Sequence, residues 1–190
     1  MGKWQIAKQF DFCYGHRVWS QKLNAEFSLD NRCVCRHIHG HQGKIIVYLE
    51  GYHLKDGMVT DFKHLNWFKK FLDDTLDHKF IIDKNDPMFD VVIPWSKVLG
   101  VTDCASKTYP LKSFDEGYQI VDPNFFKTVS DDNIIDILEG FVVVDFVPTS
   151  ENLSEWLHTI VQKKMDRLDV VVSSVKFFET PKSQSHFIGV

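Results

Sequence analysis

A run of cysteine and histidine residues between positions 33 and 41 is the part of this chain best suited to chemistry. Cys33, Cys35, His37, His39 and His41 stand at every second position, and alternate side chains of an extended segment point the same way. His39 and His41, separated by one glycine, could then reach a common ion. Imidazole nitrogens suit zinc, and three histidines with a fourth position left open are typical of a catalytic site rather than a structural one.

His16 is the predicted third ligand, because it ends a strand that precedes a long polar stretch. The same region also allows a structural Cys2His2 site made of Cys33, Cys35, His39 and His41. A one-residue gap between the cysteines is shorter than the roughly two to four residues usual in zinc fingers, so we favour the three-histidine site. A zinc hydrolase is disfavoured, because the sequence has no helical His-Glu pair such as HExxH.

Four further residues are of types used in acid–base work or in binding. Asp77 and His78 are adjacent at the end of a predicted helix, and such a pair can act as an oriented acid and base. Glu179 closes an apolar strand and could bind a guanidine-like edge, although a surface glutamate is the ordinary interpretation. Glu151, near the start of a second predicted helix, is explained by the helix dipole without any function.

The elements that must position these residues follow from hydrophobic periodicity. Apolar residues recur every third or fourth position over residues 62–76, which predicts a helix capped by Asp61 or Thr60. A second helix is predicted to begin after Thr149, its N-cap, and to end near Met165. Alternating or β-branched stretches predict four strands. These stretches are residues 3–12, 43–51, 170–178 and 186–190.

Residues 83–147 interrupt this pattern of two strands, two helices and two strands. Prolines punctuate the segment, residues 131–138 predict a short helix, and residues 141–147 predict a strand. Its apolar side chains are too numerous to be left in water, so we expect an ordered elaboration near an interface or pocket mouth rather than a linker. The chain is predicted to be a single α+β domain, residues 1–190, with an insertion at about 83–147.

Composition and charge restrict the class of protein. The chain has 190 residues, of which 44% are hydrophobic and 25% charged, as in ordinary globular proteins. A net charge of −4 argues against a nucleic-acid partner, which normally requires a clustered basic excess. No apolar run approaches the roughly 20 residues that cross a bilayer, and no signal peptide is evident, so we expect a cytoplasmic protein without a membrane partner. Cysteines 13, 33, 35 and 104 are interpreted as thiols, ligands or nucleophiles rather than disulfides.

Six motifs, in order along the chain, resemble the 6-pyruvoyl-tetrahydropterin synthase / 6-carboxytetrahydropterin synthase family. They cover roughly residues 3–84 and 147–190, and the segment between them departs from the compact family pattern. Tyr14 and Gly15 stand where the family has two alanines. The motifs are Phe12 to Arg17, similar to Phe-x-Ala-Ala-His-Arg; Cys35-x3-His39-Gly-His41; Met58 to Phe62, similar to GMVxDF; Leu76-Asp77-His78; Pro148 to Leu153, similar to PTxEN; and Glu179-Thr180.

The resemblance implies the tunnelling fold, in which a four-stranded antiparallel sheet carries two helices on one face. Members of that family assemble into trimeric barrels, usually as hexamers, and their active sites lie between subunits. A sheet of four strands leaves edges that invite pairing, and closing it with identical neighbours removes them. We therefore expect a homo-oligomer built from trimers, and a hexamer in particular.

The resemblance also implies a substrate and roles for the site residues. The implied substrate is 7,8-dihydroneopterin triphosphate. A zinc ion would hold the hydroxyl groups of its side chain and would stabilise the negative charge that develops on oxygen during the reaction. The implied metal ligands are His16, His39 and His41. The implied proton-transfer residues are Cys35 on one face of the substrate and Asp77 with His78 on the other. Glu179 would accept hydrogen bonds from the 2-amino group and ring N–H of the pterin, with Glu151 and Thr149 as weaker candidates.

Two cysteine spacings leave the reaction open between two branches of the family. Three residues separate Cys35 from the His39-Gly-His41 unit, as in the carboxy branch, whereas five residues separate Cys33 from it, as in the pyruvoyl branch. We favour Cys35, and hence 6-carboxytetrahydropterin formation with release of acetaldehyde and triphosphate, on the route to queuosine and other 7-deazaguanines. The alternatives are a 6-pyruvoyl-tetrahydropterin synthase, which eliminates triphosphate without side-chain cleavage, and a non-catalytic zinc-binding assembly module. Retention of the proposed catalytic residues argues against the module.

Overall fold

The chain divides into two compact units in the computed structural model, which describes residues 2–28, 33–100 and 108–189. The first unit comprises Met1–Tyr14, His41–Asp77 and Thr149–Val190. The second unit comprises Gly15–Gly40 and His78–Pro148. The strands β1 (Trp4–His16) and β2 (His39–Gly51) run from one unit into the other. Cys104 lies outside the described residues.

The first unit is built on strands whose alternate side chains are buried. On β1 the buried residues are Phe10, Phe12 and Tyr14, which is the period of two expected of a half-buried strand. β2 pairs antiparallel with β7 (Val171–Thr180), and β7 pairs antiparallel with β8 (Ser183–Ile188). The four strands predicted from the sequence are therefore confirmed, with β1 and β2 longer than expected.

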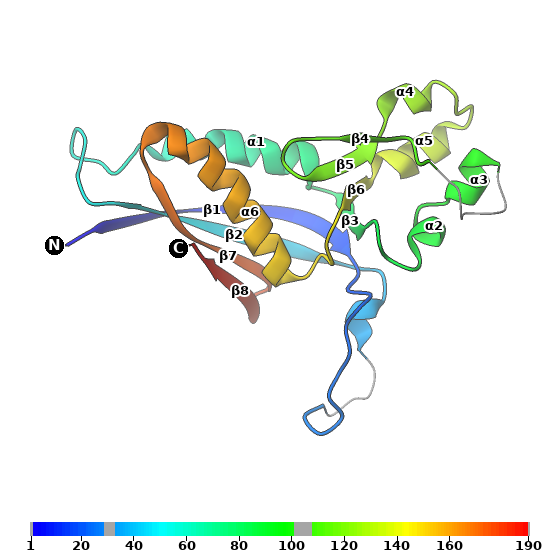
Figure 1. The fold of residues 1–190 in the computed structure, drawn as a ribbon, viewed down its shortest axis with the longest axis horizontal. Helices are drawn as coiled ribbons and strands as arrows, with labels where there is room; N and C mark the ends of the chain where they lie inside the picture. The colour runs from blue at the N-terminus through cyan, green and yellow to red at the C-terminus, as the bar shows by residue number, and fades with distance from the viewer. Residues whose placement is uncertain (1, 29–32, 101–107, 190) are drawn as a thin grey trace. The chain divides into compact units, whose positions relative to one another are not determined.

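Two helices cover one face of these strands in the first unit (Figure 1). The short 3-10 turn η2 (Phe62–Leu65) leads into α1 (Asn66–Thr75), and Asp61 caps η2 by accepting from the amide of Lys63. The second helix, α6 (Ser150–Met165), begins after Thr149 and is followed by the 3-10 turn η3 (Asp166–Leu168). Both helix predictions are confirmed, and the side chains at the predicted spacing are fully buried, except that Phe62 at the start of the series is half exposed. The buried side chains are Leu65, Phe68, Leu72 and Leu76.

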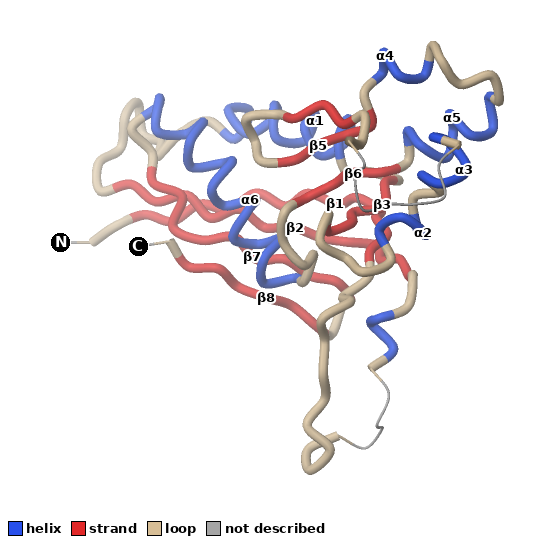
Figure 2. Tube along the Cα trace, turned by 45° about the vertical axis from the view of Figure 1, so that its right-hand side comes forward, coloured by secondary structure: helices blue, strands red, loops and turns tan. Residues whose placement is uncertain are grey.

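The second unit contains the predicted insertion and adds strands as well as helices (Figure 2). β3 (Lys79–Asp83) pairs in parallel with β6 (Phe141–Val144), and β5 (Tyr118–Val121) pairs antiparallel with both β6 and β4 (Leu111–Ser113). Four short helices accompany these strands. They are α2 (Phe89–Val92), α3 (Trp95–Leu99), α4 (Pro123–Phe126) and α5 (Asp132–Glu139).

The second unit has a hydrophobic core of its own. Ile82, Ile93, Trp95, Leu138 and Val143 are buried together in it, and none of them exposes any of its surface. Burying this much apolar surface stabilises a segment that would otherwise be unfavourable in water. The expectation of an ordered elaboration is confirmed for the described residues, as is the helix predicted at 131–138, whereas the strand predicted at 141–147 ends at Val144. Its predicted place near an interface or pocket mouth stays a prediction.

Two expectations about strands are wrong. The sheet has eight strands, in the order β4-β5-β6-β3-β1-β2-β7-β8, and not four. The extra strands come from residues 79–144, and the parallel pairing of β3 with β6 makes the sheet mixed rather than antiparallel. The run from Cys33 to His41 is not extended throughout either, because Val34–Arg36 forms the 3-10 turn η1 before β2 begins at His39. The two cysteines therefore do not share a strand face with the histidines.

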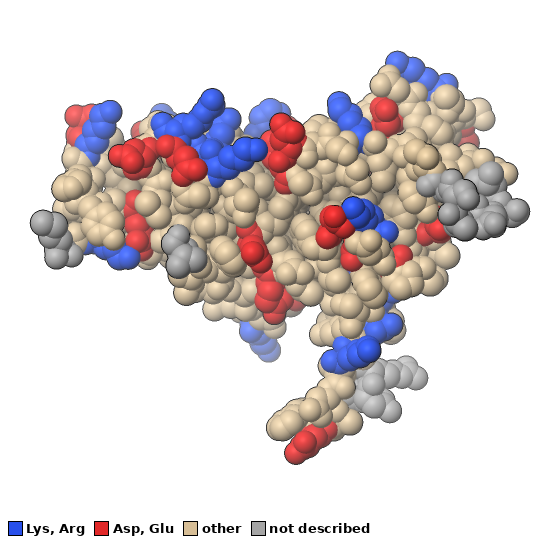
Figure 3. Space-filling view, in the orientation of Figure 1, with Lys and Arg blue, Asp and Glu red and all other residues tan. Residues whose placement is uncertain are grey.

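Charges of both signs are interspersed on the surface shown in Figure 3. The exposed side of α1 illustrates this arrangement, since Lys69 pairs with Asp73 and Lys70 pairs with Asp74 one helical turn later. Such exposed pairs contribute little to stability. Among the described residues, no helix is both long enough and apolar enough to span a membrane.

Candidate metal and pterin site

His16 is the most buried of the predicted metal ligands. It ends β1, none of its surface is exposed, and its Nδ1 lies 2.6 Å from the carbonyl oxygen of Pro148. A carbonyl oxygen can only accept a hydrogen bond, so Nδ1 must carry the proton in this contact. The other ring nitrogen, Nε2, then presents a lone pair when the imidazole is neutral, which is the form that binds metal.

His39 has the same arrangement at the start of β2. Its Nδ1 donates to the carbonyl oxygen of His37 at 2.8 Å, and its Nε2 lies 3.1 Å from Nε2 of His16. Two neutral imidazoles oriented in this way would direct lone pairs at each other. A cation between the nitrogens removes that repulsion, and the hydrogen bonds on both Nδ1 atoms are the outer contacts that orient metal-binding histidines. The pair therefore fits a metal ion.

His41 follows His39 by two residues on β2, so both side chains leave the strand on the same face. In the first unit its ring packs against Tyr14, with ring centroids 5.6 Å apart. His16, His39 and His41 each offer one ring nitrogen, and together they are a set that could hold a metal ion. Three imidazoles suit zinc. Their assignment as the ligand set stays a prediction.

Tyr14 and Glu179 form a polar feature of the first unit that sequence reasoning missed. Tyr14 is 3% exposed, and burial raises the pKa of its phenol, with a further contribution from the negative charge of Glu179. The phenol is therefore neutral at physiological pH and can donate a proton in a hydrogen bond. A Cβ added at Gly43 would come within 2.9 Å of the Tyr14 ring, so the glycine makes room for it. The sequence contained one indication of this feature, since Tyr14 stands at a position where the family has alanine.

Cys35 lies in η1 and not on a strand, and it is partly buried. Its carbonyl oxygen accepts a hydrogen bond of 2.8 Å from the amide of Val18, two residues after His16. The thiol of Cys33 contacts Oε1 of Gln21. The thiol of Cys33 is therefore engaged by a neighbouring side chain.

Asp77 is oriented by the backbone of the first unit. One of its carboxylate oxygens accepts a 2.7 Å hydrogen bond from the amide of Cys13. His78, the next residue, adopts a left-handed backbone with φ of 59°, and its side chain is exposed. A histidine with positive φ is uncommon and turns the chain sharply between α1 and β3. Within the predicted acid–base pair, the carboxylate of Asp77 is therefore fixed by a backbone hydrogen bond, and His78 stands at a sharp turn of the backbone.

Thr149 and Glu151 have structural roles in the first turn of α6. The hydroxyl of Thr149 accepts from the amide of Asn152 at 3.2 Å, which is the N-cap contact. Glu151 is exposed beside the positive end of the helix dipole and accepts a hydrogen bond from the hydroxyl of Ser150. Their participation in pterin binding stays a prediction.

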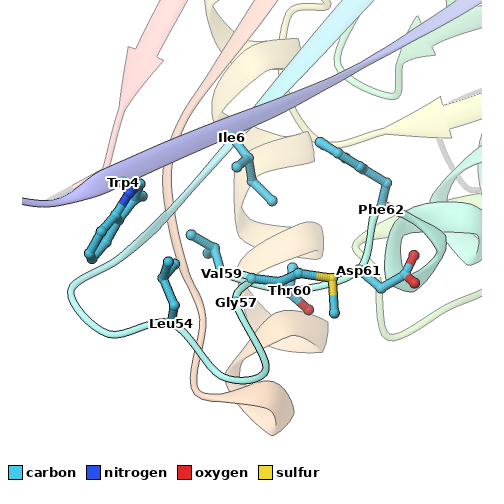
Figure 4. Close-up of a pocket in the computed structure, with 9 residues that line it drawn as sticks. Trp4, Ile6, Leu54, Gly57, Val59, Thr60, Asp61 and Phe62 are labelled. Carbon is cyan, nitrogen blue, oxygen red and sulfur yellow. The ribbon is translucent and has the colours of Figure 1, made fainter.

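A cavity of about 340 Å³ in the first unit contains none of the predicted site residues (Figure 4). Its wall is largely apolar, and Trp4 and Phe62 are each about half exposed beside it. The lining residues are Trp4, Ile6, Leu54, Gly57, Met58, Val59, Thr60, Asp61 and Phe62. Met58 to Phe62 belong to one of the six motifs, so this part of the chain builds the cavity and caps η2.

Comparison with known proteins identifies the class to which this fold and these residues belong. The profile of the family described as "6-pyruvoyl tetrahydropterin synthase" matches residues 5–188. The chain belongs to this family, whose members are lyases acting on pterins and bind a metal. The resemblance inferred from the six motifs is thereby confirmed.

Individual relatives agree with this placement. A protein of Aquifex aeolicus named 6-carboxy-5,6,7,8-tetrahydropterin synthase is 29% identical over 196 residues, covering 97% of this chain and 98% of its own length. The crystal structure of an uncharacterized protein from Wolinella succinogenes is 49% identical over the full length of both chains, with a TM-score of 0.90. The 6-pyruvoyl tetrahydropterin synthase of Caenorhabditis elegans, 21% identical with a TM-score of 0.55, covers 100% of this chain and 98% of its own. The tunnelling fold is therefore confirmed.

Proposed function

We propose that the protein is a zinc-dependent 6-carboxy-5,6,7,8-tetrahydropterin synthase. It would convert 7,8-dihydroneopterin triphosphate to 6-carboxytetrahydropterin with release of acetaldehyde and triphosphate, in the biosynthesis of queuosine and related 7-deazaguanines. The observation that carries the proposal is the pair His16 and His39, whose Nε2 atoms lie 3.1 Å apart while both Nδ1 atoms bind carbonyl oxygens. That arrangement suits a metal centre in a family of pterin lyases.

The ligands in this proposal are His16, His39 and His41. A zinc ion held there would supply Lewis-acid stabilisation of the negative charge that develops on substrate oxygen. Three neutral imidazoles leave zinc with an open position, whereas a thiolate as fourth ligand would close the site. Cys35 is therefore assigned to proton transfer and not to metal binding.

The remaining residues bind the substrate or move protons. Cys35 removes or returns a proton at the substrate side chain, and Asp77 orients His78 as a second acid–base group. Glu179 accepts hydrogen bonds from the 2-amino group and ring N–H of the pterin, because a carboxylate has two acceptor oxygens. The negative charge of Glu179 contributes, after burial, to the raised pKa of the nearby phenol of Tyr14.

The carboxy reaction is favoured over the pyruvoyl reaction by two observations. The Aquifex relative, matched over nearly its whole length, bears the 6-carboxy name. The residues from Cys35 to His41 also resemble the corresponding motif of the carboxy branch, including the positions between Cys35 and His39. We further propose that residues 1–190 form one tunnelling-fold domain with an insertion at about 83–147, and that the protein acts in the cytoplasm.

Product analysis tests the proposed function. Purified zinc-loaded protein is incubated with 7,8-dihydroneopterin triphosphate, and the products are identified by mass spectrometry. We expect 6-carboxytetrahydropterin together with acetaldehyde and triphosphate. Formation of 6-pyruvoyltetrahydropterin without acetaldehyde would instead assign the pyruvoyl reaction, and unchanged substrate would favour a non-catalytic assembly module. The same incubation with Cys35→Ala controls for breakdown of the substrate without catalysis.

We also propose that the chain forms a closed homo-oligomer built from trimers. β8 and β4 end the strand order of the sheet, and a strand at a sheet edge invites pairing with another chain. Light scattering at micromolar concentration should give a mass several times the 22.2 kDa of one chain, and about six times for a hexamer. A mass of one chain with activity intact would contradict this proposal.

A further inference from the structure

The segment that follows His16 is held by two buried carboxylates of the insertion. Arg17 and Trp19 lie one and three residues after the predicted metal ligand. Arg17 contacts Asp86 in the turn that follows β3, and Trp19 contacts Asp83, the last residue of β3. Asp83 and Asp86 are only 2% and 4% exposed. All four residues belong to the second unit. None of them has a part in the chemistry proposed above.

The contact between Arg17 and Asp86 is an ion pair withdrawn from water. Nε of Arg17 lies 2.9 Å from Oδ2 of Asp86, and the side chains are 13% and 0% exposed. Removing both charges from water costs free energy that only their electrostatic attraction returns, because Nε and Oδ2 are not aligned for a hydrogen bond. Oδ1 of Asp86 accepts from the amide of Met88 at 2.8 Å, so this carboxylate also sets the turn into α2.

Asp83 provides the second anchor. Its Oδ2 accepts a 2.9 Å hydrogen bond from the indole Nε1 of Trp19, and its Oδ1 accepts from the amide and side chain of Asn85. Asp83 ends β3, where it is paired in register with Val144 of the parallel strand β6. The anchor is therefore fixed to a strand in the core of the second unit and not to a surface loop.

The anchored segment leads directly to two residues of the proposed site. His16 precedes Arg17, and the amide of Val18, between the two anchored side chains, donates to the carbonyl of Cys35 at 2.8 Å. A shift of residues 17–19 would therefore move the ring of His16 and the loop of Cys35 together. In some proteins, buried ionic contacts help to select a single conformation. A catalytic site needs a single conformation, because its reacting groups must be held in a fixed geometry.

We propose that Asp86 and Asp83 are positioning residues, which hold His16 and Cys35 in register through Arg17, Val18 and Trp19. The expected effect on catalysis rests on the proposed function. The contacts of Asp83 with Trp19 and of Asp86 with Arg17 do not depend on that function. The insertion then has a definite task, because its first turn orients a metal ligand and a proton-transfer residue within the second unit.

Two variants of the full zinc-loaded protein test the inference. Asp86→Asn removes the charge that holds Arg17 with little change of shape, and Trp19→Phe removes the indole donor to Asp83. The first measurement is the rate of Cys35 alkylation by iodoacetamide, followed by peptide mass mapping with the exposed Cys13 as internal reference. The second is kcat against KM with the triphosphate substrate. Thermal unfolding shows whether each variant is folded.

For Asp86→Asn we expect kcat to fall by up to about 10²-fold with KM nearly unchanged, because a displacement of about 1 Å has an effect of that size. The Cys35 alkylation rate should change while that of Cys13 does not. Trp19→Phe should show the same changes to a smaller degree. Lys84→Gln is the matched control, since it breaks the exposed pair with Asp145, keeps the hydrogen bond from Asn85 to Asp145, and should leave both readouts within about twofold.

Wild-type alkylation rates and kcat in both folded variants would overturn the inference. If Asp86→Asn does not fold, Trp19→Phe decides by the same two readouts. Failure of the proposed function is distinguishable, because it would appear as absence of turnover in the unmodified protein. The alkylation rates need no substrate and would still show whether the two carboxylates position Cys35.

Discussion

Cys35→Ala should abolish turnover while leaving the zinc content unchanged. Proton transfer by a positioned side chain contributes about 10²–10⁴-fold to a rate, and kcat should fall by that amount. Zinc should stay bound because the three histidine nitrogens do not depend on the thiol. The measurements are kcat with the triphosphate substrate and zinc per chain by elemental analysis.

Cys33→Ala is the matched control, since it removes a thiol of the same Cys-x-Cys sequence. This thiol contacts Gln21, so its loss should cost about 1 kcal/mol of stability at most and have little effect on turnover. If Cys33→Ala were the inactive variant and Cys35→Ala the active one, the pyruvoyl reaction would become the better assignment. Equal activity in both variants would remove cysteine from the mechanism altogether.

The second large effect is expected from removing one metal ligand at a time. His16→Ala deletes the buried imidazole and should lower zinc affinity by more than about 10²-fold, because changing even the outer partners of ligands costs about 10–100-fold. The same direction is expected for His39→Ala and His41→Ala. Turnover should be lost in parallel, and added zinc should restore it only in part. Zinc content after dialysis and a chelator competition give the affinities.

His53→Ala is the control for this series, because His53 is an exposed histidine of the first unit outside the predicted ligand set. Its zinc content should equal that of the unmodified protein. Full zinc retention in any one of the three ligand variants would remove that histidine from the set. If all three variants retained zinc, the three histidines would not be the ligand set. The short distance between the Nε2 atoms of His16 and His39 would then be explained by a proton shared between them.

The helices and most strands could be predicted because their signals are local. A helix buries one side, so the spacing of Leu65, Phe68 and Leu72 is already present in the sequence. The cap at Thr149 is likewise a contact over three residues. The pairing of β3 with β6 joins residues about 60 positions apart, and the sequence of neither strand indicates which strand it pairs with. The eight-stranded sheet therefore could not be derived from local pattern.

For the candidate site, the sequence by itself determined which donors are available: three imidazoles, the thiols and the acid–base pair follow from residue type and spacing. Only the tertiary structure decided how they are held. His16 is oriented by a carbonyl 132 positions away, at Pro148, and Cys35 sits in a 3-10 turn rather than in an extended segment. Arg17 and Asp86 show no relation in the sequence, yet they form a buried pair. The physical reason is that ligand types are properties of single residues, whereas orientation and burial depend on contacts between segments brought together by the fold.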